Sequence, residues 1–124
     1  MRLVRVRNLT RGTDIVTHGL VADTFWTRLR GLIGRKALRP GEGLLIMPCK
    51  GVHMWFMRFP IDVIYVGADN RVVDVDEHLA PWTIGRPRKH ARYVIEVPAG
   101  TVAATDTAVG DLLSVDEGPS RTTS

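Results

Sequence analysis

Residues 61–75 read IDVIYVGADNRVVDV, and this stretch decides the class of the fold. Two runs rich in β-branched residues, 61–66 and 71–75, flank the turn-forming segment GADN at 67–70. β-Branched side chains fit the pleated surface of a sheet, while glycine, aspartate and asparagine tolerate the backbone angles of tight turns. The stretch therefore predicts a β-hairpin.

Further strands are predicted on both sides of this hairpin. In residues 2–8, Val4 and Val6 alternate with arginines, which is the pattern of a half-buried strand. The other β-rich runs are 15–22, 44–47, 93–97 and 112–115, with a loop at 81–90 and a short helix or turn at 99–107. Together these runs predict seven or eight short strands.

One main α-helix is predicted directly after the first hairpin. Asp23 is a suitable N-cap, and the apolar residues at 25, 29, 32 and 33 fall on one face of a helix that Gly34 would end. The predicted fold class is therefore mostly β (α+β), a small barrel or sandwich with the helix covering one opening.

The size of the chain, 124 residues, is that of one domain, predicted to span 1–116. Residues 117–124 contain no apolar side chain and are predicted to form a disordered tail. No apolar run approaches the length of a membrane span, and arginines occupy the N-terminus where a signal peptide needs apolar residues. These features predict a soluble, cytoplasmic protein. Cys49 is the only cysteine, which excludes an internal disulfide.

The segment 48–62, PCKGVHMWFMRFPID, carries most of the chemistry. One hypothesis is a metal site, because Cys49, His53 and Asp62 are possible ligands of zinc or copper. An extended backbone would separate Cys49 from His53 by about 13 Å, too far for one ion, and proline and glycine disfavour a helix there. We therefore predict no metal and no cofactor.

A second hypothesis is catalysis by Cys49, with His53 lowering the pKa of the thiol. A lone free cysteine more often packs as a small apolar side chain. Asp62 has apolar neighbours on both faces of its strand, so we expect it to be buried with a partner. That partner could be Arg58, Arg28, His53 or the backbone N–H groups of a turn.

A third hypothesis is a ligand pocket, because the aromatic and thioether side chains of 54–59 exceed what one short strand needs. We prefer a non-enzymatic domain that binds a small molecule or protein through 48–62 and the helix with Arg28. A metal-assisted or Cys49/His53 enzyme is the alternative. The ligand-binding candidates are Arg28, Glu42, Cys49, His53, Trp55, Met57, Arg58 and Asp62.

A basic cluster lies further along the chain, formed by Arg86, Arg88, Lys89 and Arg92. Arginine matches phosphate and carboxylate geometry, so weak binding of an anion or a nucleic acid is a second alternative. The cluster itself lacks the aromatic side chains on which bases stack, and this disfavours nucleic acid.

Four motifs occur in an order that resembles the domain-of-unknown-function family 192. They are RLRGL at 28–32 followed by GR at 34–35, EGLL at 42–45, MRFPIDVIY at 57–65 and YVIEVPAG at 93–100. The resemblance covers about 4–115 and implies a small β-rich domain with a helix after the first hairpin. It implies no particular reaction, so it assigns no catalytic residue. It points to Arg28, Gly31, Glu42, Met57 and Asp62 as the positions to test first.

Overall fold

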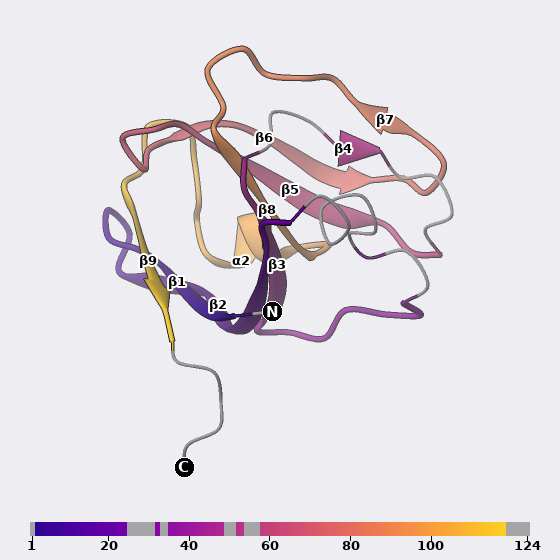
Figure 1. Cartoon of the computed structure of the whole chain (residues 1–124), viewed down its shortest axis with the longest axis horizontal. Helices are drawn as coiled ribbons and strands as arrows, with labels where there is room; N and C mark the ends of the chain where they lie inside the picture. The colour runs from indigo at the N-terminus through magenta and orange to yellow at the C-terminus, as the bar shows by residue number, and fades with distance from the viewer. Residues whose placement is uncertain (1, 25–31, 33–34, 49–51, 54–57, 119–124) are drawn as a thin grey trace.

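The computed structural model describes residues 2–24, 32, 35–48, 52–53 and 58–118. This part of the chain is built around a seven-stranded sheet with the strand order β6-β5-β8-β3-β2-β1-β9 (Figure 1). The strands of this sheet are β1 Leu3–Asn8, β2 Thr13–Ala22, β3 Glu42–Ile46, β5 Ile61–Val66, β6 Val72–Leu79, β8 Tyr93–Pro98 and β9 Leu113–Glu117. A two-stranded sheet pairs β4 (Val52–His53) with β7 (Ile84–Gly85), and helix α2 covers Thr101–Ala104.

The hairpin predicted at 61–75 is confirmed as β5 and β6. In its turn, the Gly67 N–H donates to the Arg71 carbonyl at 2.9 Å, and the Asn70 N–H donates to the Gly67 carbonyl at 3.0 Å. Asn70 adopts a φ of 64°, in the left-handed region that asparagine enters more readily than most residues. Strand β6 runs to Leu79, beyond the predicted end at 75.

The sheet curls until its two edge strands meet at one end (Figure 1). Arg71, just before β6, forms a bridge with Leu112, just before β9. The Val72 N–H also donates to the Asp111 carbonyl at 2.9 Å. The result is a curled half-barrel, which agrees with the barrel-like part of the predicted fold class.

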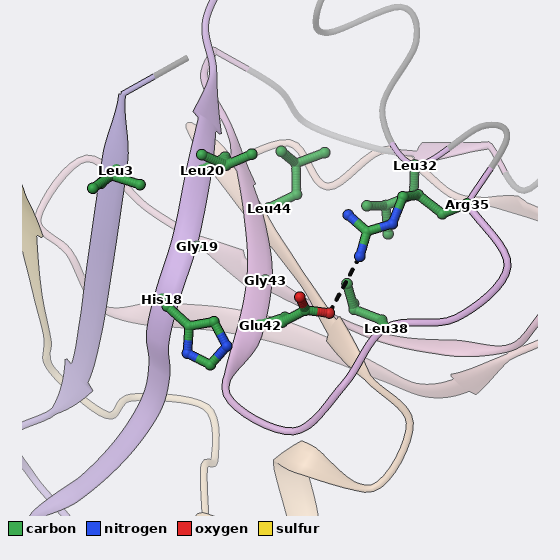
Figure 2. Close-up of a pocket in the computed structure, with 10 residues that line it drawn as sticks. All are labelled: Leu3, His18, Gly19, Leu20, Leu32, Arg35, Leu38, Glu42, Gly43 and Leu44. Atoms are coloured by element: carbon green, nitrogen blue, oxygen red, sulfur yellow. Dashed lines mark hydrogen bonds and ion pairs between the residues drawn. The ribbon is translucent and has the colours of Figure 1, made fainter. Parts of the chain in front are cut away.

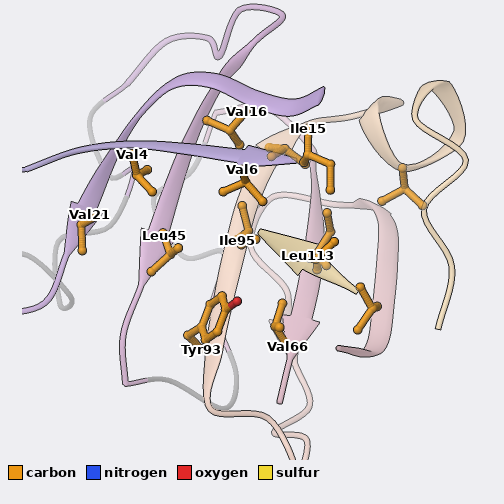
Figure 3. Packing of buried hydrophobic residues seen from close by; sticks show 14 residues of the cluster. Val4, Val6, Ile15, Val16, Val21, Leu45, Val66, Tyr93, Ile95 and Leu113 are labelled. Carbon is orange, nitrogen blue, oxygen red and sulfur yellow. The ribbon is translucent and has the colours of Figure 1, made fainter. Parts of the chain in front are cut away.

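The concave side of the curled sheet holds the main apolar core. All seven strands and α2 contribute to it, and Figure 3 shows side chains such as Val6, Ile95 and Leu113 converging there. Most of its members are valine and isoleucine, whose branched side chains suit a sheet. The alternation predicted for Val4 and Val6 is confirmed, because both are buried on this side.

A second apolar cluster lies on the outer side of β3, β5 and β8. It includes Leu44, Val63 and Val94, and the partly buried Leu38 and Phe59 pack against it. Burial on both sides explains why β5 and β8 are almost continuously apolar in sequence. The outer cluster is the part of the fold that carries the candidate site.

The helical content differs from the prediction. In the described ranges the only helix is α2, which confirms the short helix or turn predicted at 99–107 and lies near the C-terminus. Most of the main helix predicted after the first hairpin falls on 25–31 and 33–34, outside the described residues. No helix in the described ranges has the length and apolar character needed to cross a membrane.

Two further boundaries differ from the predictions. The loop predicted at 81–90 contains the short strand β7, which pairs with β4 far away in sequence. At the other end, β9 includes Glu117, which pairs with Val4, and the Gly118 N–H donates to the Leu3 carbonyl at 2.9 Å. The ordered fold thus continues past the predicted start of the tail, and 119–124 lie outside the described residues.

Candidate functional site

A pocket of about 200 Å³ opens on the outer side of the sheet, between β2, β3, Leu32 and the chain at 35–38 (Figure 2). Five leucines form its apolar walls: Leu3, Leu20, Leu32, Leu38 and Leu44. The remaining lining residues are His18, Gly19, Arg35, Glu42 and Gly43. Such a mixture, apolar walls with a few polar groups, is typical of small-molecule sites.

The pairing of β2 with β3 creates this pocket. These two strands are parallel, with His18 opposite Glu42 and Leu20 opposite Leu44. Side chains that are opposite each other in a sheet point to the same face. The pairing therefore places two leucines and two titratable side chains, from distant parts of the sequence, along one surface.

Glu42 organises the polar rim of the pocket. Its Oε1 accepts a hydrogen bond from the Arg39 backbone N–H at 2.8 Å. The same oxygen forms an ion pair with Arg35 Nη2 at 3.2 Å, drawn as a dashed line in Figure 2. Both contacts fix the chain at 35–42 against the sheet. The side chain of Arg35 remains 46% exposed, so its guanidinium can still meet a ligand.

His18 lies beside Glu42 at the same rim and is exposed. Its Nδ1 is 2.9 Å from the Thr17 hydroxyl, a hydrogen bond that orients the ring. The N–H groups of both residues also donate to the Gly41 carbonyl, at 2.9 Å from Thr17 and 3.1 Å from His18. The rim is thus held by backbone as well as side-chain contacts.

A buried carboxyl group stands next to the pocket wall. Glu96 on β8 is directly opposite Leu44 on β3 and Val63 on β5. It is only 5% exposed. Burial raises the pKa of Glu96 to about 7, so the carboxyl exchanges its proton near neutral pH.

A polar network lies on the same face beyond Val63. The Tyr65 hydroxyl donates to Asp76 at 2.8 Å, and Arg88 forms ion pairs with Asp74 and Asp76, both at 2.8 Å. The Arg88 guanidinium also stacks 4.0 Å from the centre of the Tyr65 ring. Hydrogen bonding to Arg88 holds the pKa of Asp74 below its usual range, while burial raises the pKa of Tyr65.

This network divides the predicted anion-binding cluster. Arg86, Lys89 and Arg92 are exposed, and their anion binding stays a prediction. Arg88 instead turns towards the sheet, with its side chain only 14% exposed. The sequence predicted four equivalent cations. In the structure, one of them, Arg88, is paired with Asp74 and Asp76 on β6.

Asp62 is fully buried, as predicted, but it lies on the inner side of the sheet. Its Oδ1 accepts a hydrogen bond from the His78 N–H at 2.8 Å. Its Oδ2 accepts from Gly100 N–H at 3.1 Å and Val102 N–H at 2.9 Å. Backbone N–H groups are thus the partners of Asp62. Since Glu42 faces the outer side, the structure does not bring these two candidates into one site.

The remaining ligand-binding candidates from the sequence are Arg28, Cys49, His53, Trp55, Met57 and Arg58. Arg28, Cys49, Trp55 and Met57 lie outside the described residues, so their roles stay predictions. The backbone of His53 pairs with Ile84 in the small sheet, and Arg58 is exposed. Within the described ranges, no group of three or more His, Cys, Asp or Glu side chains is placed to hold a metal ion.

Sequence reasoning missed His18, Arg35 and Glu96. For Glu96 a signal exists, because it is the one charged residue in the apolar run YVIEV at 93–97. The argument that predicts burial of Asp62, a carboxylate with apolar neighbours on both strand faces, applies equally to Glu96. For His18 no local signal exists, because its place at the pocket depends on strand pairing. Arg35 is part of the GR motif at 34–35, but its place at the pocket depends on the ion pair with Glu42.

Comparison with known proteins agrees with this architecture. The family model DUF192, described as "Uncharacterized ACR", matches residues 7–115. The UPF0127 protein of Pyrococcus furiosus is 37% identical over 112 residues, covering 86% of this chain and 93% of its own length. The UPF0127 protein of Thermococcus gammatolerans is 37% identical over 114 residues, covering 88% of this chain and 73% of its own length.

Two crystal structures share the fold. One, a protein of unknown function from Novosphingobium aromaticivorans, has a TM-score of 0.75 at 24% identity and covers 90% of this chain and 83% of its own. The other, from Sinorhizobium meliloti and called a candidate transcription regulator, has a TM-score of 0.76 at 26% identity and covers 92% of both chains. The family match over most of the sequence and the curated relatives agree, and the chain belongs to the DUF192 (UPF0127) family.

Proposed function

We propose that this chain is a non-enzymatic binding domain for a small molecule, with the leucine-lined pocket as its site. The observation that carries this proposal is the pocket itself, about 200 Å³ with five leucines in its walls. An apolar cavity of roughly 150 Å³ is large enough to hold benzene. The pocket therefore suits a ligand with an apolar body of comparable or slightly larger size.

The polar rim supports the same proposal. Glu42, one of the ligand-binding candidates from the sequence, lines the pocket together with Arg35 and His18. Because Glu42 is held by Arg35 and by the Arg39 backbone, the rim is preorganised before a ligand arrives. Preorganisation of polar groups reduces the entropy cost of binding and favours one ligand orientation.

Filling the pocket should abolish binding. With 1-hexanol as the probe, we expect saturable shifts of the amide NMR signals of Gly19, Gly43 and Leu44 in the full chain. Leu38→Trp places a large ring at the partly buried wall, so the affinity for hexanol should fall about tenfold or more. Leu9→Trp is the matched control, because Leu9 is 53% exposed and does not line the pocket. Equal binding by both variants, or no saturable shift in the unmodified chain, would contradict the proposal.

Nucleic-acid binding is a second candidate function. The name of the Sinorhizobium meliloti relative favours it, and Arg86, Lys89 and Arg92 are exposed. Cations that contact phosphates release counterions, so binding to a labelled DNA duplex should weaken steeply between about 50 and 200 mM salt. Alanine at these three positions should weaken it further in a fluorescence-anisotropy titration. Binding that is absent at low salt, or insensitive to salt, would exclude this candidate.

A further inference from the structure

The ion pair at the pocket rim uses only part of each of its side chains. Glu42 receives the Arg39 backbone N–H and the Arg35 guanidinium on the same oxygen, Oε1. Arg35 likewise uses a single nitrogen, Nη2, for Glu42 and for the Ala37 carbonyl. A carboxylate can accept on both oxygens, and a guanidinium can donate from all three nitrogens. Among the described residues, no hydrogen bond or ion pair reaches Glu42 Oε2 or the Nε and Nη1 groups of Arg35.

Both side chains line the pocket and remain in contact with solvent. Figure 2 shows their charged ends meeting next to Leu38, one of the apolar walls. The side chain of Arg35 is 46% exposed and that of Glu42 is 26% exposed. His18, opposite Glu42 on β2, is the remaining titratable residue of this rim. A ligand whose apolar part lies between the leucines therefore has one cation and one carboxylate of the protein within reach at the same edge.

The short distance within the ion pair restricts the charge of the ligand. Arg35 Nη2 and Glu42 Oε1 are 3.2 Å apart. A ligand that carries only a carboxylate can meet Arg35, but its charge then lies close to Glu42. A ligand that carries only an ammonium has the corresponding conflict with Arg35. Like charges at such short range repel each other, so the best match is a ligand with both charges on neighbouring atoms.

Further cations lie around the rim but do not line the pocket: Lys36 and Arg39 on the connecting chain, and Arg5 and Arg7 on β1. Arg7 is paired with Asp14 at 2.9 Å, and Arg5 lies opposite Asp116 on β9. All four cations are exposed, so water and salt screen their fields. The two charges that line the pocket are therefore expected to dominate recognition.

Resting on the proposed binding function, we propose that the ligand of this pocket is a free α-amino acid with an aliphatic side chain. Its ammonium donates to Glu42 Oε2, its carboxylate accepts from Arg35, and its side chain lies between the leucines. An α-amino acid carries both charges on one carbon atom, as the spacing of the rim requires. The pocket volume of about 200 Å³ suits a side chain of about four carbons, since roughly 150 Å³ holds benzene. An end of a peptide carries only one of the two charges and matches the rim less well.

The test compares three probes with the same side chain and different charges. L-leucine carries both charges, L-leucinamide only the cation and N-acetyl-L-leucine only the anion. Each is titrated into the full chain near neutral pH, and 1-hexanol is added as a fourth probe that tests the apolar pocket alone. Binding is followed through the amide NMR signals of Gly43 and Leu44. We expect L-leucine to bind about fivefold or more tightly than either singly charged analogue, because it makes one more charge-assisted contact at a half-exposed rim.

Two substitutions assign the two contacts. Glu42→Gln keeps an acceptor oxygen for the Arg39 N–H and removes the negative charge, so L-leucine and L-leucinamide should bind more weakly and N-acetyl-L-leucine more tightly. Arg35→Met should weaken L-leucine and N-acetyl-L-leucine instead. Hexanol should bind equally to both variants, within about twofold. Arg5→Met is the matched control, because Arg5 is exposed on β1 and does not line the pocket, and it should leave the order of the probes unchanged.

The outcomes separate this inference from the binding function on which it rests. If hexanol binds but L-leucine binds no more tightly than its two analogues, the amino-acid proposal is overturned and the binding function stands. If none of the four probes binds, both are overturned. Should either variant fail to fold, the Arg35 Nε–H signal is followed in the unmodified chain. It should shift with L-leucine and not with hexanol, and a signal that L-leucine leaves unmoved would overturn the amino-acid proposal.

Discussion

Replacing Asp62 with alanine is expected to lower the free energy of unfolding by about 3–5 kcal/mol. The carboxylate is fully buried and accepts three backbone N–H groups, those of His78, Gly100 and Val102. Hydrogen bonds to a charged acceptor are stronger than neutral ones, and alanine leaves all three donors buried without a partner. Two of these donors lie at the start of α2, so the substitution also loosens the helix from the sheet.

Denaturant unfolding of three variants tests this expectation. Asp62→Asn should fall between the native chain and the alanine variant, because its amide keeps one acceptor oxygen but presents an NH₂ group to the remaining donor. Asp116→Ala is the control, because Asp116 is exposed on β9 and its loss should change the unfolding free energy by about 0.5 kcal/mol or less. An Asp62→Ala variant as stable as Asp116→Ala would show that these hydrogen bonds contribute little.

Burial of Asp62 was predictable because the information is local. Its neighbours along the strand are apolar on both faces, so a carboxylate at this position has no route to solvent. The identity of its partners was not predictable to the same degree. Gly100 and Val102 are distant in sequence, and only the pairing of β5 with β8 brings the two segments together.

The same distinction, between local information and contacts of distant segments, explains which strands were predictable from the sequence. The β5–β6 hairpin was predictable because its turn residues and both its β-branched runs are contiguous. The short strands β4 and β7 were not, because each has only two residues and is defined by a partner far along the chain. Residues 84–85 also lie in a segment rich in proline and glycine, whose local preference is for a loop.

The pocket shows most clearly what local sequence patterns do not predict. Its leucines come from β1, β2, β3, position 32 and the chain at 35–38, and the parallel pairing of β2 with β3 aligns Leu20 with Leu44. No local pattern specifies a parallel pair between strands separated by a long connection. Glu42 was a candidate only because of its place in a recognised motif. Arg35 also stood in a recognised motif and joins the site through its ion pair with Glu42, whereas His18 became a site residue through the strand pairing alone.

The stability of the chain should depend on pH through Glu96. Burial raises the pKa of this carboxyl from 4.5 to about 7, so the folded chain holds the proton more tightly than the unfolded chain. Protonated Glu96 therefore makes a stabilising contribution to the free energy of unfolding. This contribution is fully present below pH 4.5 and is lost as the pH rises to 7. A difference of this size between the two pKa values corresponds to a loss of about 3 kcal/mol.

Glu96→Gln isolates this contribution, because glutamine has nearly the same shape and does not titrate. The unfolding free energies of both proteins are measured with denaturant from pH 4 to pH 8. All other titrating groups affect both proteins equally, so their effects cancel in the difference between the two free energies. Glu96→Gln should gain about 3 kcal/mol relative to the native chain between pH 4.5 and 7, and the difference should stay constant above 7. Glu77→Gln, at an exposed position, should show no such change. A difference that does not vary with pH would mean that the folded chain stabilises the charged form of Glu96 as well as water does.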